Sequence, residues 1–213
     1  MNSQAELKTE GRVARRQKRN RRSLIDAARQ IMSRKGIDAA TMLEIAELAD
    51  VGAGTVYNYF KSKEDLAIAV LEELMHELAL QIEKVTDTFD DPAQVYAFGV
   101  RTVIDTATHD MRWRQLLYRS EVIANAIFQR MGPFAIRDLQ NATHAGRFRV
   151  EDPALTWKMA CHAIVGVALA VTTEEMPIDV VDETVVTLLC MTGVGRAEAA
   201  DLANRDRPAL PKR

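Results

Sequence analysis

The sequence predicts an all-α protein of two parts, a small three-helix domain near the N-terminus and a larger helical domain behind it. Apolar residues recur every three or four positions along most of the chain, whereas no stretch after residue 64 shows the alternation of a strand. Residues that start and end helices divide this pattern into segments of ordinary helix length. At 47% hydrophobic, the 213-residue chain can bury a core.

Composition divides the chain further. The N-terminal segment has few large apolar groups, so we expect it to be disordered away from a partner. Pro208 and Pro211 interrupt regular structure near the C-terminus. The expected segments are an arm over residues 1–19, a small helical domain over 20–66, a larger helical domain over 67–205, and a frayed tail over 206–213.

Residues 41–63 predict two short helices joined by a tight turn. Thr41 caps the first helix, because its hydroxyl can accept a bond from a free amide and Glu44 completes a capping box. The apolar pattern breaks after this helix. We expect Gly52 or Gly54 to supply the backbone freedom of the turn.

The second of these helices, at about residues 53–60, turns Val56 and Phe60 inward. Small residues at its start allow close approach to base edges in the major groove. Upstream, residues 12–22 hold seven Lys and Arg and no acidic residue. A helix-turn-helix behind a basic arm is typical of proteins that bind duplex DNA. The outward-facing residues are Ala53, Gly54, Thr55, Asn58 and Tyr59.

The charge distribution agrees with this interpretation. The net charge is only −2, but residues 1–64 hold 13 Lys and Arg against 8 Asp and Glu, or +5. The remaining residues hold 15 against 22, or −7. A basic end on an acidic body fits a protein that meets DNA with one part of its surface.

The run from Met42 to Leu66 resembles the TetR family of transcriptional regulators. The Gly-Thr-x-Tyr core at 54–57, the Tyr59–Phe60 pair and the lysine-x-lysine-acid-x-leucine segment occur in register. The preceding helix, residues 23–35, fits as well, so the resemblance covers about residues 20–70. It implies a dimeric DNA-binding regulator whose larger domain binds a small-molecule effector.

The resemblance also implies a role for individual residues at the DNA. Thr41, Tyr57 and Lys63 would contact phosphates, and Tyr59 a phosphate or a base. Phosphate contacts position a protein while base contacts specify sequence, so hydrogen bonds to bases fall on the polar residues of the second helix. Because that set is sparse, we expect modest direct readout per half-site. The expected DNA-binding residues are Thr41, Ala53, Gly54, Thr55, Tyr57, Asn58, Tyr59 and Lys63.

The body of the chain reads as a series of helices. Gly132-Pro133 breaks or kinks one of them, a capped loop precedes Pro153, and Gly193 with Gly195 ends another. The expected helices cover about residues 63–87, 92–107, 111–118, 120–131, 133–143, 153–173, 179–192 and 196–204.

Two of these helices are candidates for a dimer interface. Residues 154–173 are apolar on nearly all sides and rich in small residues, and residues 180–192 repeat apolar side chains at helical spacing. Such helices face other helices, either in the core of one subunit or across two. The family resemblance favours a four-helix bundle between two copies.

The middle helices are expected to enclose the effector, because apolar walls with a few polar groups suit a small molecule. The alternatives are plain core packing, a surface ion pair between Arg101 and Asp105, and a hydrogen-bonded core histidine at His162. The candidate effector-binding residues are Phe98, Arg101, Thr102, Asp105, Trp113, Leu117, Tyr118, Phe128, Met131, Phe134, Trp157 and His162.

Other classes of protein find little support. Cys161 and Cys190 lack metal-ligand spacing and are expected to be buried free thiols, with a redox role as the alternative. No nucleophile–base pair or phosphate-binding loop indicates an enzyme, and no metal or cofactor is expected. The polar N-terminus is unlike a signal peptide, and the apolar run 163–171 is too short to span a membrane. We expect a cytoplasmic protein.

The leading functional hypothesis is a ligand-controlled repressor that binds a palindromic operator as a dimer. An effector in the larger domain would move the helix at residues 63–87 and so separate the two DNA-binding domains of the dimer. A DNA-binding activator or a regulator without a ligand is the alternative within DNA binding. A helical adaptor with an incidental basic arm is the alternative outside it.

Overall fold

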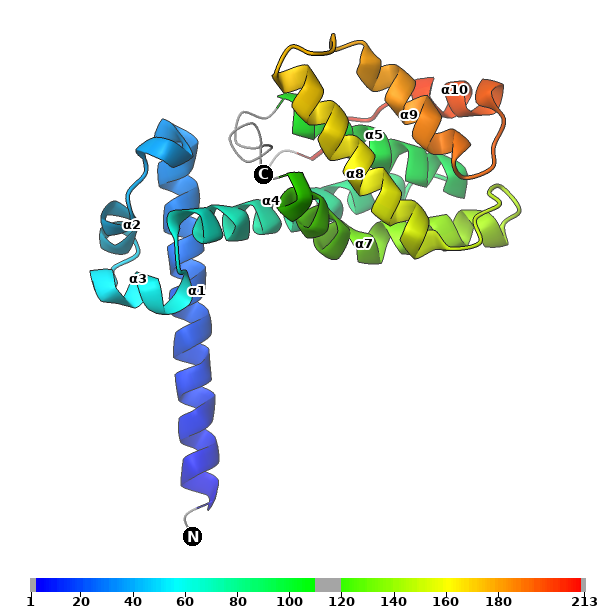
Figure 1. Cartoon of the computed structure of the whole chain (residues 1–213). Helices are drawn as coiled ribbons and strands as arrows, with labels where there is room; N and C mark the ends of the chain where they lie inside the picture. The colour runs from blue at the N-terminus through cyan, green and yellow to red at the C-terminus, as the bar shows by residue number, and fades with distance from the viewer. Residues whose placement is uncertain (1–2, 110–119, 212–213) are drawn as a thin grey trace. The chain divides into compact units, whose positions relative to one another are not determined.

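The computed structural model describes residues 3–109 and 120–211, and their regular structure is entirely helical (Figure 1). The chain divides into two compact units after Leu71. This boundary lies inside a continuous helix, a few residues beyond the expected boundary at 66. The all-α prediction is confirmed, and the expected helix at 111–118 lies outside the described residues.

The first unit is a three-helix domain in which α2 packs against both α1 and α3. Apolar side chains from all three helices form its core, with Leu24, Ile45 and Val56 fully buried. The guanidinium of Arg21 also lies 5.3 Å from the ring centroid of Phe60, at the end of α3. The helices are α1 (Ser3–Ala39), α2 (Met42–Leu48) and α3 (Ala53–Tyr59), followed by α4 (Lys63–Thr86), which runs on into the second unit.

Helix α1 changes direction at Gly36, whose φ of 82° is outside the helical range, at the predicted helix end. Residues 3–19 are also helical, where the sequence was expected to give an irregular arm. Arg, Lys, Gln and Glu keep most of their rotamer freedom in a helix, and Gly11 is the segment's one strong helix breaker. Disorder of this segment away from DNA stays a prediction.

The turn between α2 and α3 was expected to place a glycine in the left-handed region of backbone angles. The structure does not do so. Asp50 takes that conformation instead, with φ of 54°, whereas Gly52 has φ of −63°. Aspartate tolerates left-handed angles better than most residues because its short polar side chain can bond locally. The amide of Val51 closes the turn by donating to the carbonyl of Ala46 at 3.0 Å.

The second unit is a helical body in which α7 and α8 pack side by side and α5 contacts both (Figure 1). Helix α9 packs on α5, α8 and α10. Its helices are α5 (Pro92–His109), α7 (Ser120–His144), α8 (Pro153–Thr172), α9 (Val180–Cys190) and α10 (Arg196–Asn204).

Helix α7 continues through Pro133, so the predicted break at this point is wrong. Proline removes one backbone hydrogen bond, but packing on neighbouring helices offsets the loss. The residue before it, Gly132, faces the indole of Trp157: a Cβ there would lie 3.6 Å from the ring. The Gly-Pro pair therefore marks a contact between α7 and α8 rather than a helix end.

The expected loop cap is present. The Asp152 carboxylate accepts from the amide of Leu155 at 2.9 Å at the start of α8. After α9, Gly193 has φ of 87°, and a Cβ there would lie 2.9 Å from the Cβ of Arg149. Both the backbone angle and the close approach require glycine.

An ion-pair cluster around Asp91 joins three segments of the second unit. Its carboxylate accepts from Arg147 at 3.0 Å and from Arg205 at 2.9 Å, and it also caps α5 through the amide of Ala93. Arg147 in turn pairs with Glu198 on α10 at 2.7 Å. The start of α5, the loop before α8 and the end of α10 are thereby held together.

Helix α8 is the one helix of the described residues that is long and apolar enough, by length and composition alone, to cross a membrane. It packs against α5, α7 and α9 through one side, as the core helix of a globular domain does. Its other side stays exposed at Leu155, Met159, His162 and Gly166.

Candidate DNA interface and effector cavity

Helix α3 leaves accessible the side that was predicted to face DNA. Val56 is fully buried, which fixes the rotation of this short helix against the core. The residues on its other side are accessible: Ala53, Gly54, Tyr57 and Asn58 are exposed, and Thr55 and Tyr59 are half-buried.

Thr41 forms the predicted capping box at the start of α2. Its hydroxyl accepts from the amide of Glu44 at 3.3 Å and its own amide donates to the Glu44 carboxylate at 3.1 Å. Lys35 donates to the same carboxylate at 2.6 Å. The bonds from Lys35 and Thr41 lower the pKa of Glu44 to about 2. The exposed Thr41 hydroxyl is thus held in place at the surface of the unit.

Lys63 starts α4 and is tied to the first unit. Its ammonium group donates to the carbonyl of Asp38 at 2.7 Å. An ammonium group carries three donors, so this bond leaves capacity for a phosphate oxygen. The same contact would orient the side chain before DNA arrives.

A groove separates the basic part of α1 from the turn and α3. Two arginines of α1, Arg16 and Arg19, line this groove and are exposed. The same part of α1 also exposes Arg15, Lys18 and Arg22. Positive side chains around a groove beside the reading helix suit a phosphate backbone. Its lining residues are Val13, Arg16, Gln17, Arg19, Asn20, Asp50, Val51, Gly52, Thr55 and Tyr59.

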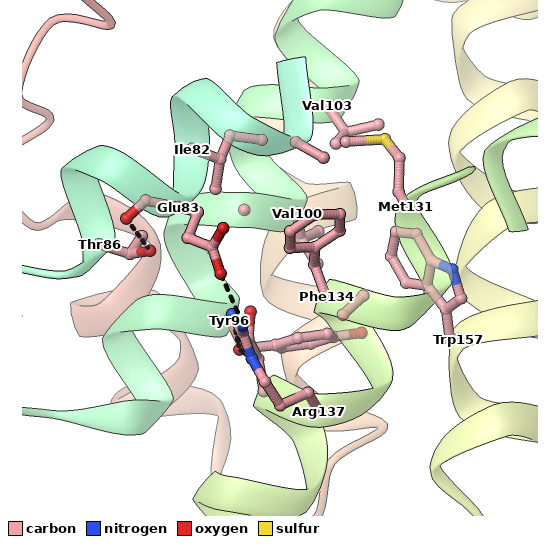
Figure 2. Close-up of a pocket in the computed structure, with 14 residues that line it drawn as sticks. Ile82, Glu83, Thr86, Tyr96, Val100, Val103, Met131, Phe134, Arg137 and Trp157 are labelled. Carbon is pink, nitrogen blue, oxygen red and sulfur yellow. Dashed lines mark hydrogen bonds and ion pairs between the residues drawn. The ribbon is translucent and has the colours of Figure 1, made fainter. Parts of the chain in front are cut away.

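A cavity lies in the second unit among α4, α5, α7 and α8 (Figure 2). The space between its walls is about 410 Å³, its open mouth included, and most of this space is narrow. Side chains of Ile82 and Glu83 from α4 face Phe134 from α7 across it. The lining residues are Ala79, Ile82, Glu83, Thr86, Tyr96, Gly99, Val100, Val103, Met131, Phe134, Ala135, Arg137, Asp138 and Trp157.

Polar groups are few in this apolar wall. Arg137 donates to Glu83 at 2.6 Å and to Asp138 at 3.0 Å, the first of these bonds joining α7 to α4 (Figure 2). Burial raises the pKa of Asp138, although the adjacent guanidinium lowers it in part. Tyr96 is 2% exposed, and its hydroxyl has no hydrogen-bond partner among the described residues. Burial also raises the pKa of this phenol, and the nearby Cys161 and Asp138 add to the effect.

The candidate effector residues fall into several groups. Met131, Phe134 and Trp157 line the cavity. Phe98 and Arg101 line a different, smaller depression beneath the C-terminal segment, while Thr102 and Asp105 lie outside the cavity wall. Trp113, Leu117 and Tyr118 lie outside the described residues.

The remaining two candidates are also outside the wall. Lys158 lies over the ring of Phe128, 4.9 Å from its centroid. His162 is exposed rather than in the core, with Nδ1 2.9 Å from the carbonyl oxygen of Lys158.

Arg101 forms the expected pair with Asp105 at 3.0 Å and also bonds Asp182 on α9.

Sequence reasoning missed the polar part of the wall. Asp138 continues a series at helical spacing that is otherwise apolar, Ile127, Met131, Phe134 and then Ala142. A carboxylate inside such a stripe is an unusual placement, since an isolated buried charge is costly. That interruption is the sequence signal that could have singled out Asp138.

The two thiols lie outside the cavity lining. Cys161 is buried, and burial raises its pKa to about 12, so the thiol stays protonated near neutral pH. Cys190 is half-buried rather than buried. A protonated, enclosed thiol is a poor nucleophile, which disfavours redox chemistry at Cys161.

The outer face of α8 carries a row of apolar residues, which we call the α8 stripe. It consists of Leu155, Met159, Ala163, Gly166, Val167 and Ala170, each exposed or half-buried. The apolar side chains of α9 differ, because Val181, Val185, Leu188 and Leu189 are buried within the unit. The exposed residues of α9 are polar, namely Asp182, Glu183 and Thr187.

Comparison with known proteins identifies both units. Residues 24–70 match the model for bacterial regulatory proteins of the tetR family. Residues 91–205, more than half of the chain, match the model for the tetracyclin repressor-like C-terminal domain. The two matches cover the helix-turn-helix and the body that contains the cavity.

The relatives include both a transcriptional activator and a transcriptional repressor. The transcriptional activator FasR of Mycolicibacterium smegmatis is 29% identical over 103 residues, 48% of this chain and 47% of that protein. The transcriptional repressor KstR of Mycobacterium tuberculosis is 39% identical over 110 residues, 52% of this chain and 50% of that protein. The chain spans about half the length of the first curated relatives that it matches.

One structural relative aligns along nearly the whole chain. The crystal structure of RolR in complex with resorcinol superposes with a TM-score of 0.84 at 29% identity, covering 93% of this chain and 100% of that one. RolR without ligand superposes with a TM-score of 0.79. With a helix-turn-helix, a helical body and both family models matched, the chain belongs to the TetR family of DNA-binding transcriptional regulators.

Proposed function

We propose that this protein is a ligand-responsive repressor that binds a palindromic operator as a homodimer. The observation that carries the proposal is that α4 supplies part of the cavity wall and also begins at Lys63, a predicted phosphate ligand. An effector that binds better when α4 is displaced would shift the population toward a form that cannot bind both half-sites.

Effector binding is supported by the relative RolR, which was crystallised with resorcinol. The cavity of this chain is lined mainly by apolar side chains with a few polar groups, as small-molecule sites usually are. Because the space between the walls is narrow, a ring-sized ligand would have to displace a side chain of the wall, and we expect Phe134 or Met131 of α7 to move. Arg137 would pass that movement to Glu83 on α4.

Dimerisation is supported by the α8 stripe. An apolar face with small residues at Ala163, Gly166 and Ala170 allows the same helix of a second copy to approach closely. Two-fold symmetry makes such an interface self-complementary. It would also place two reading heads on half-sites about one helical turn apart, ~34 Å, or a multiple of this. The polar outer face of α9 would form the rim.

At the operator, Thr41, Tyr57 and Lys63 would bind phosphates, and Thr55, Asn58 and Tyr59 would contact bases. The accessibility of these side chains supports the assignment, since Thr41, Tyr57 and Asn58 are exposed and Thr55, Tyr59 and Lys63 are half-buried. Ala53 and Gly54 have no side-chain donor, so they would add shape and thymine-methyl contacts rather than hydrogen bonds. The arginines of α1 would supply sequence-independent affinity. A chromosomal target implies a cytoplasmic location.

The proposal is tested with purified full-length protein and the DNA upstream of its own coding sequence. We expect protection of a palindrome in footprinting, binding that weakens steeply with salt, and increased transcription of the adjacent gene when the regulator is deleted. Decreased transcription on deletion would identify an activator instead. No protected palindrome in this or neighbouring upstream regions would contradict the operator proposal.

A further inference from the structure

We propose that the cavity recognises a small uncharged ring compound bearing at least one hydroxyl group, and that it rejects carboxylates. Asp138 would accept a hydrogen bond from that hydroxyl group, and Tyr96 would provide the second polar contact. The inference rests on the proposed function, since it takes this cavity as the effector site. It goes further by assigning the chemistry that selects the ligand to named residues.

Tyr96 provides the first argument. Its side chain, on α5, is 2% exposed and lines the cavity, yet its hydroxyl has no partner among the described residues. Burying a hydroxyl without a hydrogen bond is unfavourable, so native proteins rarely leave one in this state. A ligand oxygen in the cavity would satisfy it, either as acceptor or as donor.

Asp138 provides the second argument. Its side chain, on α7, is only 12% exposed and lines the same cavity. Both contacts from Arg137, through Nε and Nη2 at 3.0 Å, fall on the single oxygen Oδ1. The Oδ2 oxygen is therefore the one that a ligand hydroxyl would reach. A carboxylate that accepts from a hydroxyl gives a stronger bond than a neutral acceptor does.

The charge balance of the wall excludes acids. Among the lining residues that the structure describes, Glu83 and Asp138 are acidic and Arg137 alone is basic. Arg137 already bonds both carboxylates. A ligand carboxylate would therefore lie against a wall of net negative charge, and the guanidinium of Arg137 is already paired with Glu83 and Asp138. Phosphate esters and acyl carboxylates are disfavoured for the same reason.

The apolar walls limit the ligand's shape. Aromatic and branched side chains from three helices surround the narrow space, among them Phe134, Trp157 and Val100. A flat ring can stack between such side chains.

The test is calorimetric titration of the full-length protein with a matched set of ring compounds. Resorcinol and phenol can donate a hydroxyl proton, 1,3-dimethoxybenzene has the ring but no donor, and benzoate carries the excluded charge. We expect at least one hydroxylated ring to bind roughly 10- to 100-fold tighter than the methyl ether and benzoate. Equal or tighter binding of benzoate or the ether would overturn the proposal, as would no binding of either hydroxylated ring at millimolar concentration.

Two variants test the residue assignments. Tyr96→Phe removes only the unpartnered hydroxyl, so hydroxylated-ring affinity should fall about tenfold while the unliganded protein melts no lower than the parent. A purely structural role would lower the melting temperature as well, and that outcome would overturn the assignment. Asp138→Asn should weaken binding at least as much, whereas Asp90→Asn, a matched change at an exposed carboxylate, should leave it unchanged.

Parallel operator titrations separate this inference from the proposed function. A hydroxylated ring that binds with the expected dependence on Tyr96 and Asp138, but leaves operator affinity unchanged, supports the recognition chemistry and contradicts ligand control of DNA binding. Intact operator binding with no affinity for hydroxylated rings overturns the inference alone.

Discussion

Arg137 on α7 donates a hydrogen bond to Glu83 on α4 across 2.6 Å. Two helical turns earlier on the same face of α7, Arg130 pairs with Glu72 of α4 at 2.5 Å. Helix α7 is therefore fastened to α4 at two points, one in the cavity wall and one outside it. The pair between Arg130 and Glu72 can therefore be removed to change how α7 moves α4 without changing a residue of the cavity wall.

We predict that Arg130→Gln uncouples effector binding from DNA release. Both side chains of the pair are partly exposed, so its loss should cost at most about 1 kcal/mol of stability. Affinity for the hydroxylated ring should stay within about twofold, because Arg130 is not a lining residue. The ratio of operator affinities without and with effector, from fluorescence anisotropy, should fall toward one. An unchanged ratio would show that the pair does not transmit the signal.

A second prediction concerns Gly54, where a Cβ would meet nothing within 4 Å. Gly54→Leu should therefore fold normally, and it should gain about 0.5–1 kcal/mol because glycine is a poor residue inside a helix. Operator binding should nevertheless fall by more than tenfold, since the added side chain occupies space needed at the groove floor. Thermal melting and anisotropy measure the two effects. Retained affinity would show that this end of α3 does not approach the bases.

The phosphate and base contacts make a third prediction, with opposite outcomes for two residues. Lys63→Gln should weaken binding to all duplexes about equally and reduce the slope of log affinity against log salt by about one. Asn58→Ala should instead reduce the preference for operator over scrambled DNA while leaving that slope unchanged. Lys63 also bonds the Asp38 carbonyl, so the melting temperature is measured as the control for folding. The reverse pattern would exchange the two assignments.

Local signals made the reading head predictable from sequence. The capping box at Thr41 and Glu44 and the helix end at Gly36 each depend on residues within a few positions, and both are present. The turn was misassigned because Gly52 or Gly54 was expected to take the left-handed angle, whereas Asp50 adopts it. A glycine and an aspartate are both compatible with the local pattern, and the packing of α3 on α2 decides between them.

The cavity was harder to predict, because helix α5 is apolar on more than one face. The sequence pointed to Phe98, Arg101, Thr102 and Asp105, which share one face of α5 at helical spacing. The structure turns the neighbouring face, Tyr96, Gly99, Val100 and Val103, toward the cavity. Periodicity identifies the faces of a helix but not the partner that each one meets, which depends on helices distant in sequence.

The α8 stripe gives a fourth prediction. A Cβ at Gly166 would meet nothing within 4 Å, so Gly166→Arg should leave the subunit folded while placing a charge in the proposed interface. Sedimentation or light scattering should show a shift from dimer to monomer, and operator affinity should fall because two half-sites are no longer linked. Glu151→Arg, at an exposed position just before α8, serves as a control that should stay dimeric. A dimeric Gly166→Arg protein would place the interface elsewhere.

The Asp91 cluster predicts how stability depends on acid. Burial raises the pKa of this carboxyl, but the hydrogen bonds from Arg147 and Arg205 outweigh it and hold the pKa at about 2, below the ordinary 3.8. A folded-state pKa below the unfolded value means that the unfolded chain binds the proton more readily. The stabilisation is therefore complete above about pH 4 and is lost as the pH falls toward 2.

Asp91→Asn should remove that contribution. Near neutral pH we expect a loss of about 1–2 kcal/mol, because two guanidinium groups lose a charged partner that is itself only partly exposed. The difference in unfolding free energy between parent and variant, from urea titrations at several pH values, should shrink between pH 4 and 2. Asp90→Asn, the adjacent exposed carboxylate, should show no such convergence. A difference that stays constant down to pH 2 would mean that the cluster holds the loop by packing rather than by charge.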